Sequence, residues 1–501
     1  MSLAVIYSRA QLGIQAPLVF VEVHLSNGLP ALSIVGLPET AVRESKDRVR
    51  SALLNSGFEF PARRITINLA PAELPKQGGR YDLAIALGIL AASGQVPLEP
   101  LPTYEFVAEL ALSGATRPVH GVLSSAVAAK ESGRQLICAP GNCHEASLGG
   151  PDSVRSAAHL LDACRQLHEP ATLSVAAPPE LQFSAAEIPD LRDVSGQQQA
   201  RRALEVAAAG AHNLLFSGPP GTGKTLLASR LPGILPELSD GEALEAASVA
   251  SVSSAGFSPQ HWKQRPFRAP HHTASAVALV GGGSTPRPGE ISLAHQGVLF
   301  LDELPEFQRQ ALETLREPME TGYVTISRAA RQTVFPACFQ LVATMNPCPC
   351  GFLGDPNGRC RCTADQIQRY RQRISGPLLD RIDLQVNMLR VPWRQLEAPA
   401  SEASATVRQR VLQARDRQAS RGTLNARLPT EKIHAHCSLD QNQRNLLEKA
   451  VQHFCLSPRA VHGILKVSRT IADLAGEQHV GNLHLQEAIG YRCTEKTAAP
   501  A

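Results

Sequence analysis

Residues 218–225 read Gly-Pro-Pro-Gly-Thr-Gly-Lys-Thr, and this stretch decides how the chain around it folds. An apolar run precedes it and residues 226–230 continue as a helix, so the order is strand, glycine-rich loop, helix. In that context backbone N–H groups close around phosphate oxygens, a lysine adds positive charge, and a hydroxyl can hold Mg²⁺. We therefore predict a P-loop that binds ATP through Gly218, Pro219, Pro220, Gly221, Thr222, Gly223, Lys224 and Thr225.

Polar side chains follow two further apolar runs. The first run ends in Asp302 and Glu303, and the second, residues 339–344, is followed by Asn346. Downstream of a P-loop, we expect Asp302 to complete the Mg²⁺ shell with Thr225 and Glu303 to polarise the attacking water. Asn346 would orient that water from the neighbouring strand. The pattern predicts an α/β core with a parallel sheet and ATPase chemistry at one edge.

Composition limits the class of protein. The chain has 501 residues, of which 43% are hydrophobic and 19% charged, and this length predicts about three domains. A net charge of +4 permits a nucleic-acid partner without arguing for one. The N-terminus has no signal pattern, and the most apolar helical stretch, residues 83–92, is too short to cross a bilayer. Eleven cysteines, mostly scattered, fit a reducing compartment, so we expect a cytoplasmic protein with no membrane partner.

Residues 1–167 are predicted to form an α+β domain. Strands are expected at 18–25 and 32–35, and the Ser-Asn-Gly turn between them predicts a hairpin. The helix at 83–92 is apolar nearly all round and must be buried.

Three segments follow this domain. Proline-rich residues 168–189 predict a linker, and residues 190–391 form the ATPase core. Residues 392–501 are predicted to be a helical lid, in which the arginine-dense helix at 407–421 is expected to present a solvated face.

Parts of the N-terminal domain resemble the proteolytic domain of Lon-type proteases. The Leu-Pro-Lys-Gln-Gly segment at 74–78, the buried helix after it and a later Thr-Arg-Pro-Val-His-Gly stretch carry the resemblance. Arg80, however, stands where that family has its nucleophilic serine, and Leu123 stands near the place of its lysine. Ser124 and Ser125 have no adjacent lysine or histidine to act as a base. We expect a Lon-like fold without peptidase activity.

Two insertions in the core bear on the substrate. Residues 266–295 contain Pro-Phe-Arg-Ala-Pro-His-His-Thr and a run of three glycines. Residues 322–334 are typical of a β-hairpin with Arg328 and Arg331 near its tip. In a ring, such tips would point into the central pore and suit a phosphate backbone; an ordinary surface hairpin is the alternative.

A wider resemblance covers residues 8–492. The P-loop, Ala-Pro-His-His-Thr, Pro-Gly-Glu-Ile-Ser-Leu-Ala-His before Gly-Val-Leu-Phe-Leu-Asp-Glu, and Ser-Gly-Pro-Leu-Leu-Asp-Arg-Ile-Asp resemble magnesium-chelatase-like AAA+ ATPases. With the Lon-like domain and a cysteine cluster, the chain resembles the ComM (YifB) branch, the bacterial competence-associated branch-migration helicases. The resemblance implies a homohexameric, ATP-driven ring that migrates single-stranded or branched DNA during homologous recombination and natural transformation. ATP or DNA could trigger assembly, and recombination proteins are candidate partners.

The resemblance also assigns two arginines. Arg381 stands where this clade has its arginine finger, with Arg371 and Arg373 as stand-ins, and Arg459 stands where the helical lid offers a second sensor. Charge spreads over the γ-phosphoryl oxygens in the transition state, so an arginine supplied in trans ties hydrolysis to subunit contact. A surface role is the alternative for Arg459.

Four cysteines form two C-x-C pairs across a polar loop. Four soft ligands in a loop with few apolar residues suit tetrahedral zinc, although the spacing is tighter than the usual C-x₂₋₄-C; free thiols are the alternative. The adjacent histidines 271–272 are alternative ligands, for which a structural role is favoured. The four cysteines are Cys348, Cys350, Cys360 and Cys362.

Two other functions compete with a DNA translocase. A chelatase motor subunit shares the ATPase core but lacks the Lon-like domain and the cysteine loop. An ATP-dependent protease shares the N-terminal fold, but here Arg80 replaces the nucleophile.

Overall fold

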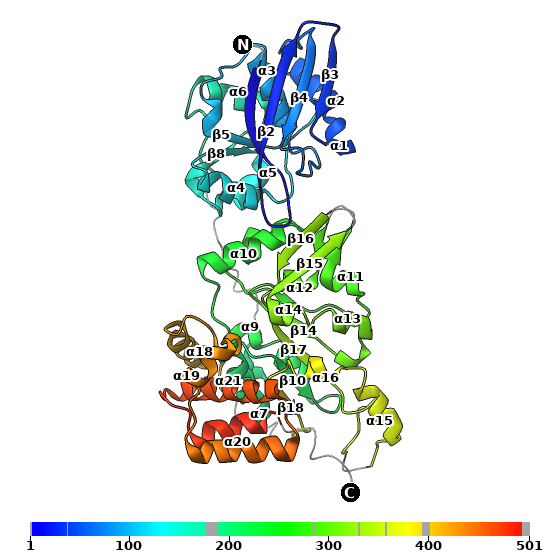
Figure 1. Ribbon diagram of the computed structural model, residues 1–501, viewed down its shortest axis with the longest axis vertical. Coiled ribbons are helices and arrows are strands. Elements are labelled where there is room, and N and C mark those ends of the chain that lie inside the picture. The colour runs from blue at the N-terminus through cyan, green and yellow to red at the C-terminus, as the bar shows by residue number, and fades with distance from the viewer. Residues whose placement is uncertain are drawn as a thin grey trace. The chain divides into compact units, whose positions relative to one another are not determined.

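The structure is a computed structural model, and contacts divide the chain into two compact units (Figure 1). The first unit comprises Met1–Ser184, Asp240–Trp262 and Ser327–Phe335, and the second comprises the remaining segments. The N-terminal unit thus includes two segments that the sequence assigned to the core. The residues that the structure describes are 3–37, 39–176, 189–283, 286–328, 331–355, 358–392 and 401–492.

The first unit is built on a seven-stranded mixed sheet, in the order β3-β4-β2-β1-β5-β8-β9. The strands are β1 (Leu3–Arg9), β2 (Leu18–Ser26), β3 (Ala31–Val35), β4 (Arg64–Ala70), β5 (Tyr104–Val107), β8 (Gln135–Cys138) and β9 (Val154–Ser156), and β6 (Glu109–Leu110) pairs with β7 (Thr116–Arg117). The helices of this unit are α1 (Thr40–Arg43), α2 (Ser45–Asn55), α3 (Asp82–Ala92), α4 (Val122–Glu131), α5 (Pro140–Ser147), α6 (Leu160–His168) and α10 (Asp240–Ser251).

The pairing of β3 corrects the predicted hairpin. β2 and β3 are not neighbours, because β4 lies between them, antiparallel to β2 and parallel to β3. Ile65, Ile67 and Leu69 of β4 are fully buried, whereas the residues of β3 are at most half-buried. β4 buries its apolar side chains in the inner position, and β3 forms the edge of the sheet. The buried helix was predicted correctly, since all 11 residues of α3 are buried.

The second unit contains a five-stranded parallel sheet, in the order β11-β14-β17-β10-β18. Every residue of β14 and β17 is buried, as expected where helices cover both faces. This confirms the α/β fold class with a parallel sheet. The strands of this sheet are β10 (Leu214–Ser217), β11 (Phe267–Arg268), β14 (Val298–Leu301), β17 (Gln340–Met345) and β18 (Leu384–Asn387).

Smaller elements surround this sheet. β12 (Gly281–Gly282) pairs with β13 (Arg287–Pro288), and β15 (Tyr323–Arg328) forms a hairpin with β16 (Arg331–Pro336). The hairpin predicted at 322–334 is thus present. The helices are α7 (Gln198–Gly210), α8 (Lys224–Ala228), α9 (Leu231–Ile234), α11 (Ala276–Val280), α12 (Glu290–Leu293), α13 (Arg309–Glu313), α14 (Pro318–Thr321), α15 (Ala364–Arg371) and α16 (Gly376–Leu379).

The C-terminal residues form the expected helical region, which packs on α7 through α18 and α21 (Figure 1). Within the part of the chain that the structure describes, no helix is both long and apolar enough to span a membrane. The helices of this region are α18 (Ser404–Ala419), α19 (Thr430–His436), α20 (Gln441–Phe454), α21 (Pro458–Ala475) and α22 (Asn482–Gly490).

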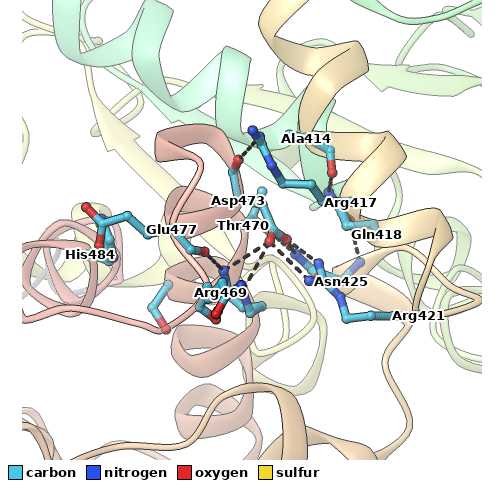
Figure 2. Close-up of polar contacts among 12 residues, drawn as sticks. Ala414, Arg417, Gln418, Arg421, Asn425, Arg469, Thr470, Asp473, Glu477 and His484 are labelled. Carbon is cyan, nitrogen blue, oxygen red and sulfur yellow. Dashed lines mark hydrogen bonds and ion pairs between the residues drawn. The ribbon is translucent and has the colours of Figure 1, made fainter.

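The solvated face predicted for residues 407–421 is wrong for several of their arginines. Figure 2 shows Asp473 of α21 facing Arg421, which donates to it across the bundle, with Asn425 donating at 2.7 Å. Arg415 donates to the carbonyl oxygen of Ala208 on α7 at 2.7 Å. Asp473 is 1% exposed, so its carboxylate needs the hydrogen bonds from Arg421 and Asn425 to offset its lost hydration. Arginines of this segment therefore attach it to the neighbouring helices α7 and α21.

Candidate nucleotide site

The P-loop joins β10 to α8 and has the shape of a phosphate cradle. Gly221 and Gly223 have φ angles of +78° and +86°, and a Cβ at either position would meet nothing within 4 Å. Glycine adopts this left-handed conformation without the steric cost that other residues incur. The loop thus turns its backbone around open space at a helix N-terminus, which fits the phosphates of ATP.

Lys224 lies at the centre of this loop. Its Nζ donates to the carbonyl oxygens of Gly218 at 2.6 Å and Pro219 at 2.9 Å, and to Oδ1 of Asn346 at 3.1 Å. Burial lowers the pKa of the Lys224 amino group, and the nearby carboxylates act in the opposite direction. The structure therefore brings together the P-loop lysine and the asparagine that sequence placed 122 residues away.

The first carboxylate joins the P-loop hydroxyl. Thr225 Oγ1 donates to Oδ2 of Asp302 at 3.0 Å, so two oxygens of the kind that Mg²⁺ prefers lie together. Thr344, which the sequence did not indicate, donates to the other carboxylate oxygen and accepts from the Glu303 N–H at 3.1 Å. Register explains this: Leu301 pairs with Ala343, which puts the next residue of each strand side by side. Thr225 and Asp302 fit an Mg²⁺ site.

Glu303 has a histidine neighbour that the sequence also missed. The backbone of Glu303 is left-handed, with φ of +55°, an unfavourable conformation for this residue that is often found at functional sites. His272 Nδ1 lies 3.7 Å from its Oε2, and the His271 ring lies 4.1 Å from the His272 ring, centroid to centroid. The alternative that these histidines complete the cysteine cluster is not supported, because the described thiol group contains four cysteines alone.

Arg381 and Arg459 lie together, on Glu320 of α14. Arg381 donates to Glu320 Oε1 at 2.6 Å and to the Pro377 carbonyl at 2.6 Å, and Arg459 forms an ion pair with the same oxygen. Burial and the neighbouring Arg459 lower the pKa of Arg381. The contact with Arg459 lowers the pKa of the Glu320 carboxyl more than its other neighbours do. Among the described residues, neither arginine forms a hydrogen bond or ion pair with the P-loop of its own chain.

The stand-in arginines have other surroundings. Arg373 pairs with Glu306 at 3.0 Å, next to the strand end that bears Glu303. Arg371 Nε is buried and has no hydrogen-bond partner among the described residues. Arg381 and Arg459 thus share one acceptor, Glu320, whereas Arg371 and Arg373 share no acceptor among the described residues.

The predicted DNA contacts lie at the tip of the hairpin. Residues 329–330 and the side chains of Arg328 and Arg331 lie outside the described residues. The DNA contact assigned to these two arginines stays a prediction.

The four cysteines converge. Their Sγ atoms all lie within 4.8 Å of one another, and Cys348 Sγ lies 3.4 Å from Cys350 and 3.8 Å from Cys360. Cys348 is fully buried, and Cys350, Cys360 and Cys362 are half-buried. Four thiols at this mutual distance can present one tetrahedral set of soft ligands.

Among the described residues of the region that resembles a Lon protease, Ser124 and Ser125 have no base hydrogen-bonded to them. Arg80 is buried and donates to backbone carbonyls of Arg9 and His120 at 3.4 and 2.5 Å. The hydroxyls of Ser124 and Ser125 are buried without a hydrogen-bond partner among the described residues. A serine nucleophile requires a base within hydrogen-bond reach, and neither serine has one.

Comparison with known proteins identifies the family of this chain. Family models described as "Magnesium chelatase, subunit ChlI", "Subunit ChlI of Mg-chelatase" and "Magnesium chelatase, subunit ChlI C-terminal" match residues 190–396, 21–142 and 401–492. "Competence protein ComM" of Haemophilus influenzae is 54% identical over 500 residues, which are 98% of each chain. The chain belongs to the ComM/YifB family.

Two further relatives are consistent with this family assignment. "Uncharacterized protein YifB" of Escherichia coli is 51% identical over 99% of this chain and 98% of its own. "Lon protease 2" of Bacillus subtilis is 28% identical over 116 residues, which are 23% of this chain and 20% of that protease. The magnesium-chelatase-like parts expected from the sequence are thus present, a stretch of 116 residues is similar to a Lon protease, and the family is one of AAA+ ATPases.

Proposed function

We propose that this chain is an ATP-driven ring motor that moves branched DNA, and thereby promotes branch migration during recombination and natural transformation. The observation that carries the ATPase part is the convergence of Lys224, Thr225, Asp302 and Asn346 at one sheet edge. Bound ATP with Mg²⁺ would supply the γ-phosphoryl group that is transferred to water. The Lys224 amino group would stand against the phosphates, and Thr225 and Asp302 would hold the metal.

Glu303 is proposed as the residue that takes the proton of the attacking water. Its carboxylate stands one residue beyond the metal ligand, and Asn346 stands across the site on the next strand. A positioned base contributes about 10²- to 10⁴-fold to a rate. His272, 3.7 Å from Glu303, would hold that carboxylate in place.

Arg381 and Arg459 are proposed to complete the site of a neighbouring subunit. Both pair with Glu320, and neither contacts the P-loop within the described chain. Glu320 keeps their charges satisfied until a neighbour's phosphates replace it. This arrangement supports self-association as a homohexameric ring, because each chain then holds half of two sites.

The DNA part of the proposal rests on the ComM relative and on charge. That relative is named a competence protein, and competence concerns the uptake of DNA. Arg328 and Arg331 of the hairpin are proposed to contact the phosphate backbone in the pore. Binding should then weaken steeply with salt, because contacts to phosphates release counterions.

We also propose that the four thiolates of Cys348, Cys350, Cys360 and Cys362 bind one zinc ion. Their convergence within 4.8 Å supports this, and so does the polar character of the loop, which lacks an apolar core of its own.

The test combines hydrolysis with DNA movement. Purified chain should hydrolyse ATP faster when a four-way DNA junction is added and should convert the junction into duplex products. The Lys224→Ala variant is the control and should do neither. Stimulation by a tetrapyrrole-binding partner without any by DNA would favour a chelatase subunit. ATP-dependent casein cleavage would favour a protease, and either result would overturn the proposal.

A further inference from the structure

The cysteine loop lies directly against the P-loop. Cys348 follows Asn346 by two residues, so one end of the loop begins at the side chain that contacts Lys224. Gly351, next to Cys350, is buried, and a Cβ there would lie 2.7 Å from Cδ of Pro220 in the P-loop. A heavy atom at that distance is inside van der Waals contact, so the two loops are packed as closely as glycine allows.

The other end of the loop also returns to Asn346. Cys362 is followed by Thr363, which caps α15 together with Gln366 through hydrogen bonds of 3.0 and 3.3 Å. Near the end of this helix lies the buried Tyr370: burial raises the pKa of its hydroxyl, and the nearby backbone of Asn346 acts in the opposite direction. Both chain segments that leave the thiol cluster therefore lie near the same asparagine.

Few apolar contacts hold this loop in place by itself. Phe352 is half-buried, and the guanidinium carbons of Arg359 and Arg390 lie 4.6 and 5.9 Å from its ring centroid. Such exposed cation–π contacts contribute about 0.5 to 1 kcal/mol each, far less than a structural metal site. A metal that joins the four sulfur atoms would therefore add much of the rigidity of this loop, Gly351 included.

We propose that the metal held by the four thiolates braces the P-loop and Asn346, so that nucleotide binding and turnover depend on metal occupancy. This rests on the proposed zinc site and not on DNA movement. The metal fixes Cys348 and Cys350, and Gly351 then sets the position of Pro220. Displacement of a reacting group by about 1 Å can cost about 10²-fold in rate. The cluster is a positioning device and touches no substrate.

The first experiment measures metal and nucleotide on the same full-length samples. Wild type should carry one zinc per chain by elemental analysis, and Cys360→Ser should lose it. We expect Cys360→Ser to bind a fluorescent ATP analogue about tenfold more weakly or worse, as when the support of a metal site is removed. Cys455→Ser, an exposed cysteine outside the cluster, is the matched control and should keep both metal and affinity.

The second experiment separates the contact from the metal. Gly351 and Gly354 both have φ of +79°, but a Cβ at Gly354 would meet nothing within 4 Å. Alanine at either position has the same backbone strain, and only Gly351→Ala pushes on Pro220. Gly351→Ala should retain zinc and bind nucleotide several times more weakly than Gly354→Ala.

Each possible result tests the zinc site, the brace or both. Wild type without metal, after expression in zinc-supplemented medium, removes the zinc site and the brace together. Loss of zinc from Cys360→Ser with unchanged nucleotide affinity leaves the zinc site standing and overturns the brace. Equal affinities of Gly351→Ala and Gly354→Ala also overturn it. All these measurements omit DNA, so failure of the DNA proposal would not affect them.

Discussion

At the scale of single residues, the contact between His272 and Glu303 is a feature of the site that the sequence did not predict. Glu303 is half-exposed, at 52% of its side chain, and its backbone is held in a left-handed conformation. A carboxylate with this freedom has several rotamers. A histidine 3.7 Å away restricts them, so His272 is expected to affect turnover rather than binding.

The His272→Ala variant tests this. We expect a lower kcat with an unchanged Kd for ATP, because the side chain contacts Glu303 and not the P-loop. His271→Ala removes the ring beside His272 but leaves the contact between His272 and Glu303, so it should lower kcat less than His272→Ala does. Glu303→Gln sets the scale and should reduce kcat by about a hundredfold or more. A His272→Ala enzyme as fast as wild type would show that the contact has no catalytic role.

At the scale of elements, the segment that follows α18 is attached to α21 through one carboxylate. Asp473 accepts from Arg421, from Asn425 and from Arg469, the last at 3.0 Å, and is 1% exposed. Several donors from different segments meet on this group (Figure 2). Removing it takes the carboxylate partner from the guanidinium groups of Arg421 and Arg469, which keep uncharged acceptors.

We therefore predict that Asp473→Ala lowers the free energy of unfolding of the second unit by about 3 to 5 kcal/mol, the usual cost of breaking a buried ion pair. Denaturant unfolding followed by helical circular dichroism measures it. Arg408→Ala is the matched control, because its pair with Glu237 is exposed and should contribute about 1 kcal/mol or less. Equal effects of the two changes would contradict the prediction.

In the first unit, α5 carries a carboxyl group that burial makes pH-sensitive. Burial raises the pKa of Glu145 to about 7, and its Oε1 has no hydrogen-bond partner among the described residues. The folded pKa lies above the unfolded one, so the folded state retains a proton that the unfolded state has lost. Stability is therefore highest below the unfolded pKa and falls as the pH rises towards 7.

The measurement is hydrogen exchange of the α5 amides at pH 5 and pH 8, corrected for intrinsic exchange. Wild type should lose up to about 3 kcal/mol of protection over this range. Glu145→Gln keeps the shape of the side chain without its titration and should lose much less. A wild type whose protection is equal at both pH values would refute the assignment.

At the scale of the whole molecule, we propose that the position of Arg381 and Arg459 at Glu320 makes each chain an incomplete enzyme. Both proposed transition-state arginines are held by one carboxylate within the second unit. If each completes a neighbour's site, activity must require assembly.

Subunit mixing tests this directly. Lys224→Ala should lose its own nucleotide site, and Arg381→Ala should lose the group it lends to its neighbour. Each variant alone should be inactive, whereas a mixture should recover part of the wild-type ATPase rate. Arg381→Ala should still bind ATP in a fluorescence titration. A mixture that stays inactive would place Arg381 in the site of its own chain.

The sequence alone determined the local chemistry of this protein. The strand, glycine-rich loop and helix at 218–225, and the carboxylates after β14, follow from residues that are adjacent in the chain. Such local patterns limit backbone conformation directly. The burial of α3 and the α/β class were also predicted, because they depend on composition within one element.

Only the tertiary structure decided which elements became neighbours. It placed β4 between β2 and β3, Thr344 on Asp302, His272 beside Glu303, and Gly351 against Pro220. It also turned Arg415 of α18, and Arg421 just after this helix, inward. These pairings depend on the free energy of burying surface and satisfying charge over a whole unit, which no short stretch of sequence contains.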